Sequence, residues 1–370
     1  MNGNLYHNKK AQWATYILFF ALLALVPVFV PQAFLLNQFA RYCVYAMLAV
    51  SVSLVWGFGG ILSLGQGIAF GLAAYGMGMT MMMQGQDPVS NPIPGFMLSN
   101  ELDHLPLMWE PFWSPTVGVT LALLVPTVFF MIFGTLMFQA RVAGVFVAIM
   151  TLAELAALYF LVYDMQPFTG GFPGLPAAQP FKAFGISIDP YTPLGYWLAV
   201  GLLAVITLGT KALLQSKFGL IVQATRDDPE RVRLLGYSVS LYQIVVYTIS
   251  GIIAALAGIW WVMLTQFVSP TALETQFSIS MVIWAAVGGR RSLFGAIIGA
   301  YLVNGLQSYA GDTFLDTWML ILGGIFIIVV RFLPMGLAGL FETAIGYVST
   351  NLLFLKPKKY LSAERLRAAE

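Results

Sequence analysis

Long apolar stretches recur along the whole chain and are separated by short polar segments. A helix needs about 20 mainly apolar residues to cross the ~30 Å hydrocarbon core of a bilayer, and ten stretches approach that length. The pattern therefore predicts an all-α polytopic membrane protein with about ten transmembrane helices. The eighth and ninth stretches are short, so we expect one or both to be broken or tilted helices packed inside protein. The ten predicted spans are roughly 13–30, 39–57, 65–84, 115–138, 144–163, 193–213, 242–264, 276–289, 295–310 and 317–333.

Composition supports a membrane protein. Hydrophobic residues make up 59% of the 370 residues and charged residues 9%, against about 25% charged in soluble domains. A water-soluble fold could not bury so much apolar surface, whereas lipid can cover it. Lys9 and Lys10 precede the first apolar stretch, and no small-residue cleavage pattern follows it. We interpret that stretch as a retained first span and not as a signal peptide.

The distribution of positive charge predicts the orientation. If the N-terminus is cytoplasmic, 16 of the 18 Lys and Arg residues fall on the cytoplasmic side, and only Arg41 and Lys182 fall outside. This is the asymmetry that the positive-inside rule describes. An even number of spans returns the C-terminus to the cytoplasm. The expected organisation is a transmembrane domain over residues 1–345 and a cytoplasmic tail over residues 346–370.

A charged island interrupts the apolar pattern at residues 217–236. It holds seven of the 34 charged side chains and is expected to form two short helices joined by a turn. Asp228 suits the N-cap of the second helix, Pro229 its first position and Glu230 its positive end. Arg231 falls in the last turn, and Gly236 can end the helix in a left-handed conformation. The island is either a solvated loop that anchors two spans by its charge or a docking element for a cytoplasmic partner.

Two loops on the predicted outer side are long. Residues 85–114 are rich in proline and contain two tryptophans, which suit the membrane interface. Residues 164–192 contain a glycine-rich turn at 169–175. Proline and glycine at this density exclude regular helix. Such loops exceed what simple linkers need and are consistent with an outer lid or an outer binding partner.

A short motif occurs twice. Gly59-Gly60-x-x-Ser63-Leu64-x-x-x-Ile68 reappears as Gly288-Gly289-x-x-Ser292-Leu293-x-x-x-Ile297, with an offset of 229 residues. Both copies leave the predicted cytoplasmic side and begin a span that runs outward. The motif is consistent with a parallel internal repeat, as in transporters that arose by duplication, or with chance in a glycine-rich chain.

Few polar side chains fall within the predicted spans. Glu154 is the clearest, and Thr151 lies one turn before it on the same helix face. A carboxylate inside a bilayer normally faces protein or water and is a functional candidate, although a structural hydrogen bond is the simpler interpretation. Ser63 and Gln66 begin the third span among glycines that permit close packing or an unwound segment. Together with Gly170 and Gly171 of the second outer loop, these residues form the predicted translocation path.

Several kinds of chemistry have no sequence signal. Cys43 is the only cysteine, and the two histidines, His7 and His104, are far apart, so neither a disulfide framework nor a metal site is expected. The chain has no phosphate-binding loop of the G-x-x-x-x-G-K-[ST] type. Any ATP chemistry must therefore come from another chain, and no nucleic-acid-binding pattern is present.

The motifs together resemble the branched-chain amino-acid type permease family of ABC importers, over about residues 40–340. The most specific match is Arg226-Asp-Asp-Pro-Glu-Arg-Val-Arg-Leu-Leu-Gly236-Tyr, which looks like the family's cytoplasmic coupling segment. The stretch Ile283-Trp-Ala-Ala-Val-Gly-Gly-Arg, the stretch Asn304-Gly-Leu-Gln-Ser-Tyr-Ala and the ending Arg331-Phe-Leu-Pro-Met-Gly-Leu look most like the second permease subunit of bacterial urea importers. Arg291 departs from the family pattern, which usually has glycine there. The long 85–114 loop also exceeds that of amino-acid members.

The resemblance implies a transport subunit of the bacterial inner membrane that works by alternating access and is not itself an enzyme. A periplasmic substrate-binding protein would deliver the substrate, a second homologous permease would complete the path, and two cytoplasmic ATPase subunits would dock at 217–236. ATP and Mg would be bound by those ATPases, with no cofactor in this chain. The residues implied in ATPase coupling are Arg226, Asp227, Asp228, Pro229, Glu230, Arg231 and Gly236.

The substrate that the resemblance suggests is urea or a short amide, with a branched-chain amino acid as the alternative. A small neutral substrate needs hydrogen-bond partners and no counter-ion, which suits a path poor in charge. A free-standing urea or ammonium channel would also have a neutral path, but it gives the charged island no role. A membrane enzyme is the least favoured class, because the spans contain neither paired carboxylates nor histidines.

Overall fold

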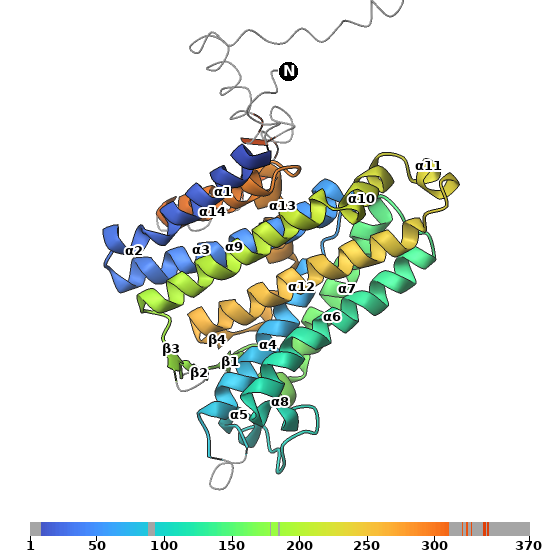
Figure 1. Ribbon diagram of the computed structural model, residues 1–370. Coiled ribbons are helices and arrows are strands. Elements are labelled where there is room, and N and C mark those ends of the chain that lie inside the picture. Colours follow the sequence, from blue (N-terminus) through green and yellow to red (C-terminus); the bar gives the residue numbers. More distant parts are fainter. Residues whose placement is uncertain are drawn as a thin grey trace, which may run out of the picture.

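The computed structural model describes residues 9–87, 93–177, 179–183 and 186–310, and a few isolated positions beyond them. Three parts of the sequence lie outside the described residues, namely the predicted tenth span (317–333), the tail (346–370) and the motif that starts at Arg331. The exceptions are Leu320, Gly323, Gly324 and Ile327 of the span and Gly336 and Leu337 of the motif. Figure 1 shows a bundle of helices with short strands at one end.

The first half of the bundle contains α1 (Lys9–Ala24), α2 (Val26–Phe29), α3 (Ala33–Val52), α4 (Gln66–Gln84), α6 (Pro115–Gln139) and α7 (Val145–Asp164). Helix α3 continues directly into a π-helix, η1 (Ser53–Phe58). The second half contains α9 (Pro193–Gln215), α10 (Lys217–Asp227), α11 (Pro229–Leu234), α12 (Val239–Thr265), α13 (Thr275–Gly288) and α14 (Leu293–Ala310). The predicted spans up to residue 310 therefore all coincide with helices, although the first is split into α1 and α2.

Five of these helices are long and apolar enough to cross a membrane: Ala33–Phe58, Pro115–Gln139, Val145–Asp164, Pro193–Gln215 and Val239–Thr265. Helices α13 and α14 pass the same test only as a pair, and they are bent by 118° at their junction. The predicted eighth and ninth spans are thus two short helices that together count as one bent candidate span, which raises the number of candidate spans to six. The protein is a multi-pass membrane protein, whereas ten spans and cytoplasmic termini stay predictions.

Close approach of helix backbones holds the centre of the bundle together. Helix α12 packs against α4 and α6 through small residues. A Cβ atom at Gly258 would lie 2.1 Å from the carbonyl oxygen of Phe70, and one at Gly251 would lie 2.4 Å from the ring of Phe130. Glycine at such positions lets helices pack closely in lipid, where the hydrophobic effect does not drive them together.

The two long loops meet at the end of the bundle where the strands lie. In its described part the first loop forms the single turns α5 (Gly95–Leu98) and η2 (Glu110–Trp113), and its Met97 and Trp109 share a small core with Met79 and Met83 of α4. The Trp109 indole donates to the Phe168 carbonyl of α8 (Gln166–Thr169) at 2.9 Å. The second loop adds two antiparallel ribbons, so the fold is predominantly helical and not strictly all-α. One ribbon pairs β1 (Leu175–Pro176) with β4 (Phe267–Val268), and the other pairs β2 (Phe181–Ala183) with β3 (Ile186–Ile188). A 3₁₀ turn, η3 (Pro270–Leu273), then leads into α13.

Candidate docking segment and translocation path

The charged island forms a capped pair of helices, α10 and α11, at the end of the bundle opposite the strands (Figure 1). The Asp228 carboxylate accepts the backbone N–H of Arg231 at 3.1 Å, and Pro229 follows as the first helical residue. At the other end, Gly236 N–H donates to the Arg233 carbonyl at 2.9 Å and Tyr237 N–H donates to the Val232 carbonyl at 3.2 Å. This pair of bonds is a Schellman motif, and Gly236 has the left-handed φ of +86° that it requires. The predicted start and end of this helix are confirmed.

The surface of α11 combines self-contained ion pairs with exposed leucines. Arg231 pairs with Asp228 at 2.7 Å, and Arg233 pairs with Glu230. Val232 anchors the helix in the protein, whereas Leu234 and Leu235 are 88% and 74% exposed. The charges hold the shape of α11, and the leucines provide an apolar contact at its tip. We call residues 217–236 the docking segment from here on.

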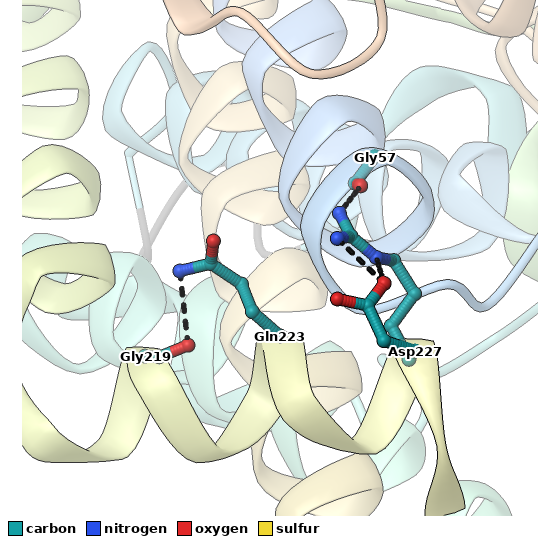
Figure 2. A network of polar contacts seen from close by, with 5 residues as sticks. Gly57, Gly219, Gln223 and Asp227 are labelled. Atoms are coloured by element: carbon teal, nitrogen blue, oxygen red, sulfur yellow. Dashed lines mark hydrogen bonds and ion pairs between the residues drawn. The ribbon is translucent and has the colours of Figure 1, made fainter. Parts of the chain in front are cut away.

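Arg226 differs from the other arginines of the docking segment because it points back into the bundle. Its guanidinium donates to the carbonyl of Gly57 in η1 at 2.9 Å, as Figure 2 shows. The same guanidinium forms an ion pair with Asp227 at 2.8 Å. Gln223, one turn earlier in α10, donates to the Gly219 carbonyl at 3.1 Å and so stabilises the helix that carries Arg226.

The chain between η1 and α4 is unwound and largely buried. Residues 60–65 form no helix, and Ser63 in their middle is fully buried. Side chains from distant helices satisfy this backbone. The Leu64 N–H donates to the Thr151 hydroxyl at 3.1 Å, and the Ser278 hydroxyl donates to the Leu64 carbonyl at 2.7 Å. Non-helical backbone at membrane depth is tolerated where protein or a water-filled cavity surrounds it. We call residues 60–65 the helix break.

Gln66 lies directly after the helix break and is 1% exposed. Its amide nitrogen donates to the Ser250 hydroxyl of α12 at 3.1 Å. Its amide oxygen, one carboxylate oxygen of Glu154 and the Tyr247 hydroxyl are buried and have no hydrogen-bond partner within the described chain. Because buried polar atoms normally have partners, these three atoms are candidates for contact with a polar substrate or with water.

The predicted path residues do not all lie together. Ser63, Gln66 and Thr151 gather at the helix break, and Glu154 is half-buried one turn beyond Thr151 on α7. Gly170 and Gly171 follow the opposite end of α7, in a turn that leads to β1. Both have positive φ, +78° and +56°. The geometry therefore divides the candidate path into a polar site at the helix break and a glycine turn beside the strands.

The repeated motif forms similar turns in its two copies. Gly60 and Gly289 both have positive φ, +72° and +117°. In each copy the serine hydroxyl accepts a backbone N–H just before or within the next helix: Ser63 accepts from Gly65, and Ser292 accepts from Gly295. The chain enters α4 after the first turn and α14 after the second. Both copies thus place a positive-φ glycine and a serine acceptor before a helix, and the internal repeat stays a prediction.

No group of three or more His, Cys, Asp or Glu residues able to hold a metal occurs in the described ranges.

The family model of the branched-chain amino acid transport system permease component matches residues 34–330. The chain belongs to this permease family. It is accordingly a permease subunit of an ABC importer, and the family implies an inner-membrane protein that works with ATPase and substrate-binding partners.

Relatives of this permease carry different substrates. It is 26% identical to the high-affinity branched-chain amino acid transport system permease protein LivM of Salmonella typhimurium, over 80% of this chain and 67% of LivM. It is 37% identical to the fructose import permease protein FrcC of Rhizobium meliloti, over 31% of this chain and 34% of FrcC. It is also 26% identical to the ribose import permease protein RbsC of Escherichia coli K12, over 52% of this chain and 61% of RbsC. No solved structure is significantly similar to this permease.

Sequence reasoning missed three residues of the permease that the structure brings to the two sites. Ser278 contacts the helix break and Ser250 contacts Gln66, yet nothing in the sequence distinguishes either serine from the other hydroxyl residues near it, such as Ser280 and Thr248. Gly57 accepts from Arg226, and its only sequence signal is its position just before Gly59 and Gly60. The only hint in the sequence was that each serine is a polar residue within an apolar helix. Their partners, Leu64 and Gln66, lie some 200 residues away in the chain and could not be identified from it.

Proposed function

We propose that this permease pairs with a second homologous permease, docks two cytoplasmic ATPase subunits through the docking segment and receives its substrate from a periplasmic binding protein. ATP and Mg are bound by the ATPases, and this chain carries no cofactor of its own. The N- and C-termini lie in the cytoplasm. The observation that carries this proposal is the capped α11 helix with Leu234 and Leu235 exposed at its tip.

A docking role fits the physical chemistry of α11 better than an anchoring role. An anchoring loop needs only positive charge near the headgroups, and it does not need a fixed conformation. Here an N-cap, two internal ion pairs and a Schellman motif fix the helix and its end. An exposed apolar patch with polar residues around it is typical of an interaction site, and Leu234, Leu235 and Tyr237 are exposed together at this tip. Rigid presentation also lowers the entropy lost when a partner binds.

The substrate that we propose is urea or a short amide. The polar groups at the helix break are an amide, hydroxyls and one carboxylate, from Gln66, Ser63, Thr151, Tyr247 and Glu154. Such groups can donate to a urea carbonyl and accept from its N–H groups. Urea is neutral and brings no charge that would need a counter-ion at this site.

A branched-chain amino acid is the second candidate substrate, because the resemblance to LivM extends over most of the chain. In that case the backbone N–H groups at the start of α4, directly after the helix break, would bind the substrate carboxylate. The free-standing channel considered from the sequence is not retained, because the chain belongs to a family of ABC importer permeases.

Reconstitution tests these proposals. The permease is purified with its second permease and its ATPases, inserted into proteoliposomes and supplied with the cognate binding protein. Uptake of labelled urea, acetamide and leucine is measured with and without ATP. ATP-dependent uptake of urea or acetamide supports the proposal. Uptake of leucine alone would show that the substrate is an amino acid, and equal urea uptake with and without ATP would contradict ATP-driven import.

A further inference from the structure

Arg226 lies within the docking segment in the sequence, but its side chain is mostly buried. Its side chain is 17% exposed, whereas that of Arg231 is 84% exposed. Its guanidinium donates to the Gly57 carbonyl and to the Asp227 carboxylate, so most of its polar capacity is used inside this chain. In Figure 2, dashed lines join the labelled Gly57 and Asp227 to one guanidinium group, which these contacts identify as that of Arg226. Little of Arg226 remains for an ATPase to contact.

The carbonyl that Arg226 binds lies in an unusual piece of backbone. Gly57 is in the π-helix that follows α3, and π-helices occur often at functional sites. The backbone bonds that close this turn come from Gly59, Gly60 and Ile61 and go to Leu54, Trp56 and Val55, respectively. Arg226 thus donates a hydrogen bond to the Gly57 carbonyl at the point where the chain leaves the π-helix.

The turn between α13 and α14 meets η1 at the same point. A Cβ atom at Gly57 would lie 1.6 Å from the carbonyl oxygen of Arg290, so only glycine fits. The Ser53 hydroxyl donates to that same Arg290 carbonyl at 2.8 Å. The docking segment, η1 and the turn of the bent α13–α14 pair therefore meet within a few side-chain lengths.

Arg226 also touches the start of the helix break. A Cβ atom at Gly60 would lie 2.5 Å from the Cγ atom of Arg226. The aliphatic part of Arg226 thus lies against Gly60, the first residue of the helix break. Its guanidinium binds the Gly57 carbonyl in the last turn of η1, just before the break. A displacement of α10 moves both contacts together. Four residues further along the chain lies Leu64, whose backbone is held by Thr151 and Ser278.

We propose that Arg226 is a positioning residue that transmits movement of the docking segment to the helix break, and that it does not bind the ATPase. This inference rests on the proposed function, because it presumes that ATPases move the docking segment. The exposed part of α11 makes the contact with the ATPases, and Arg226 carries the displacement to the Gly57 carbonyl and Gly60. Asp227 holds the guanidinium in the orientation that this requires.

The test separates assembly from coupling. Arg226→Gln removes the charge and the forked donor, and it is compared with the parent in the complete reconstituted transporter. ATPase co-purification, ATP hydrolysis and uptake are measured with whichever labelled solute, urea or leucine, the parent imports. We expect parent levels of bound ATPase and of basal hydrolysis. We expect uptake per ATP to fall at least about 10-fold, within the range of usual coupling between sites.

Arg141→Gln is the control, because it removes the same charge from an exposed side chain in the turn between α6 and α7, outside the docking segment. Its uptake per ATP should equal the parent value. Arg226→Lys provides a second variant if the glutamine variant does not accumulate. A lysine is a single point charge and cannot bridge Gly57 and Asp227 as the guanidinium fork does, so uptake per ATP should again fall.

Two results would overturn the inference. Unchanged uptake per ATP in both Arg226 variants would show that the contact transmits nothing. Loss of bound ATPase in proportion to the loss of uptake would make Arg226 a docking residue. If the parent complex imports neither solute with ATP, the proposed function fails instead, so the two failures are distinguishable.

Discussion

The Thr151 hydroxyl accepts the backbone N–H of Leu64 at 3.1 Å and donates to the Val147 carbonyl at 2.9 Å. One side chain of α7 thus replaces the helical partner that the Leu64 amide loses at the helix break. Inside a bilayer no water would compensate for that loss.

Thr151→Val should destabilise the permease, because it keeps the shape of the side chain but leaves the Leu64 N–H without an acceptor. Leaving one buried donor unpaired costs about 1–3 kcal/mol. The measurement is the thermal unfolding of the detergent-solubilised protein. Thr151→Ser keeps the hydroxyl and is the control. Equal transition temperatures for the valine and serine variants would show that this bond does not support the break.

Glu154→Gln should lower transport while leaving the assembled complex at parent levels. The half-buried carboxylate has one oxygen without a partner in the described chain, so an amide of the same size tests its charge and not its packing. Uptake in proteoliposomes and the yield of complex are the two readouts. Glu110→Gln, on the exposed turn η2, serves as the control. If uptake by the Glu154 variant matches the control, Glu154 has only a structural role.

Gly236→Val should weaken docking of the ATPases, because it strains the backbone at the end of α11 without removing a side-chain contact. Nothing lies within 4 Å of a Cβ atom placed at Gly236, but its φ is +86°, and a left-handed conformation costs an L-residue about 1–2 kcal/mol. We expect poor co-purification of the ATPases, with loss of substrate-stimulated hydrolysis and uptake. Gly236→Asn is the control, because asparagine tolerates this conformation.

Glu230→Arg should have a similar effect for an electrostatic reason. It places positive charge at the positive end of α11 and breaks the pair with Arg233. Co-purification of the ATPases is again the measurement. If both this variant and Gly236→Val retain ATPases and coupled uptake, the docking segment is only a solvated loop.

The predicted orientation can be tested by thiol labelling. Cys43 is fully buried and is replaced by alanine, after which single cysteines are placed at Ser99 and Ser362. Ser99 lies on the exposed surface of the first long loop, whereas Ser362 falls in the tail beyond the described residues. An impermeant reagent added outside should label position 99 and leave position 362 unlabelled. The opposite labelling pattern would reverse the topology.

Short-range features of this protein were determined by the sequence alone. Apolar stretches near 20 residues long predict spans, because the bilayer thickness sets the required length. The ends of α11 were equally predictable. Asp228 caps an amide three residues away, and the Schellman bonds at Gly236 join residues at most five apart. Such bonds depend on local backbone geometry, and the residue types that form them are therefore visible in the sequence.

The tertiary structure alone decided which residues meet. The bonds from Thr151 and Ser278 to Leu64 join residues 87 and 214 positions apart, and the bond from Arg226 to Gly57 joins residues 169 apart. Sequence analysis assigned Arg226 to the same surface as Arg231, and packing turned its side chain inward. A backbone carbonyl or amide carries no residue identity, so the sequence does not show which ones a helix break exposes. Those partners exist only because folding brings α7, α10 and α13 against the break.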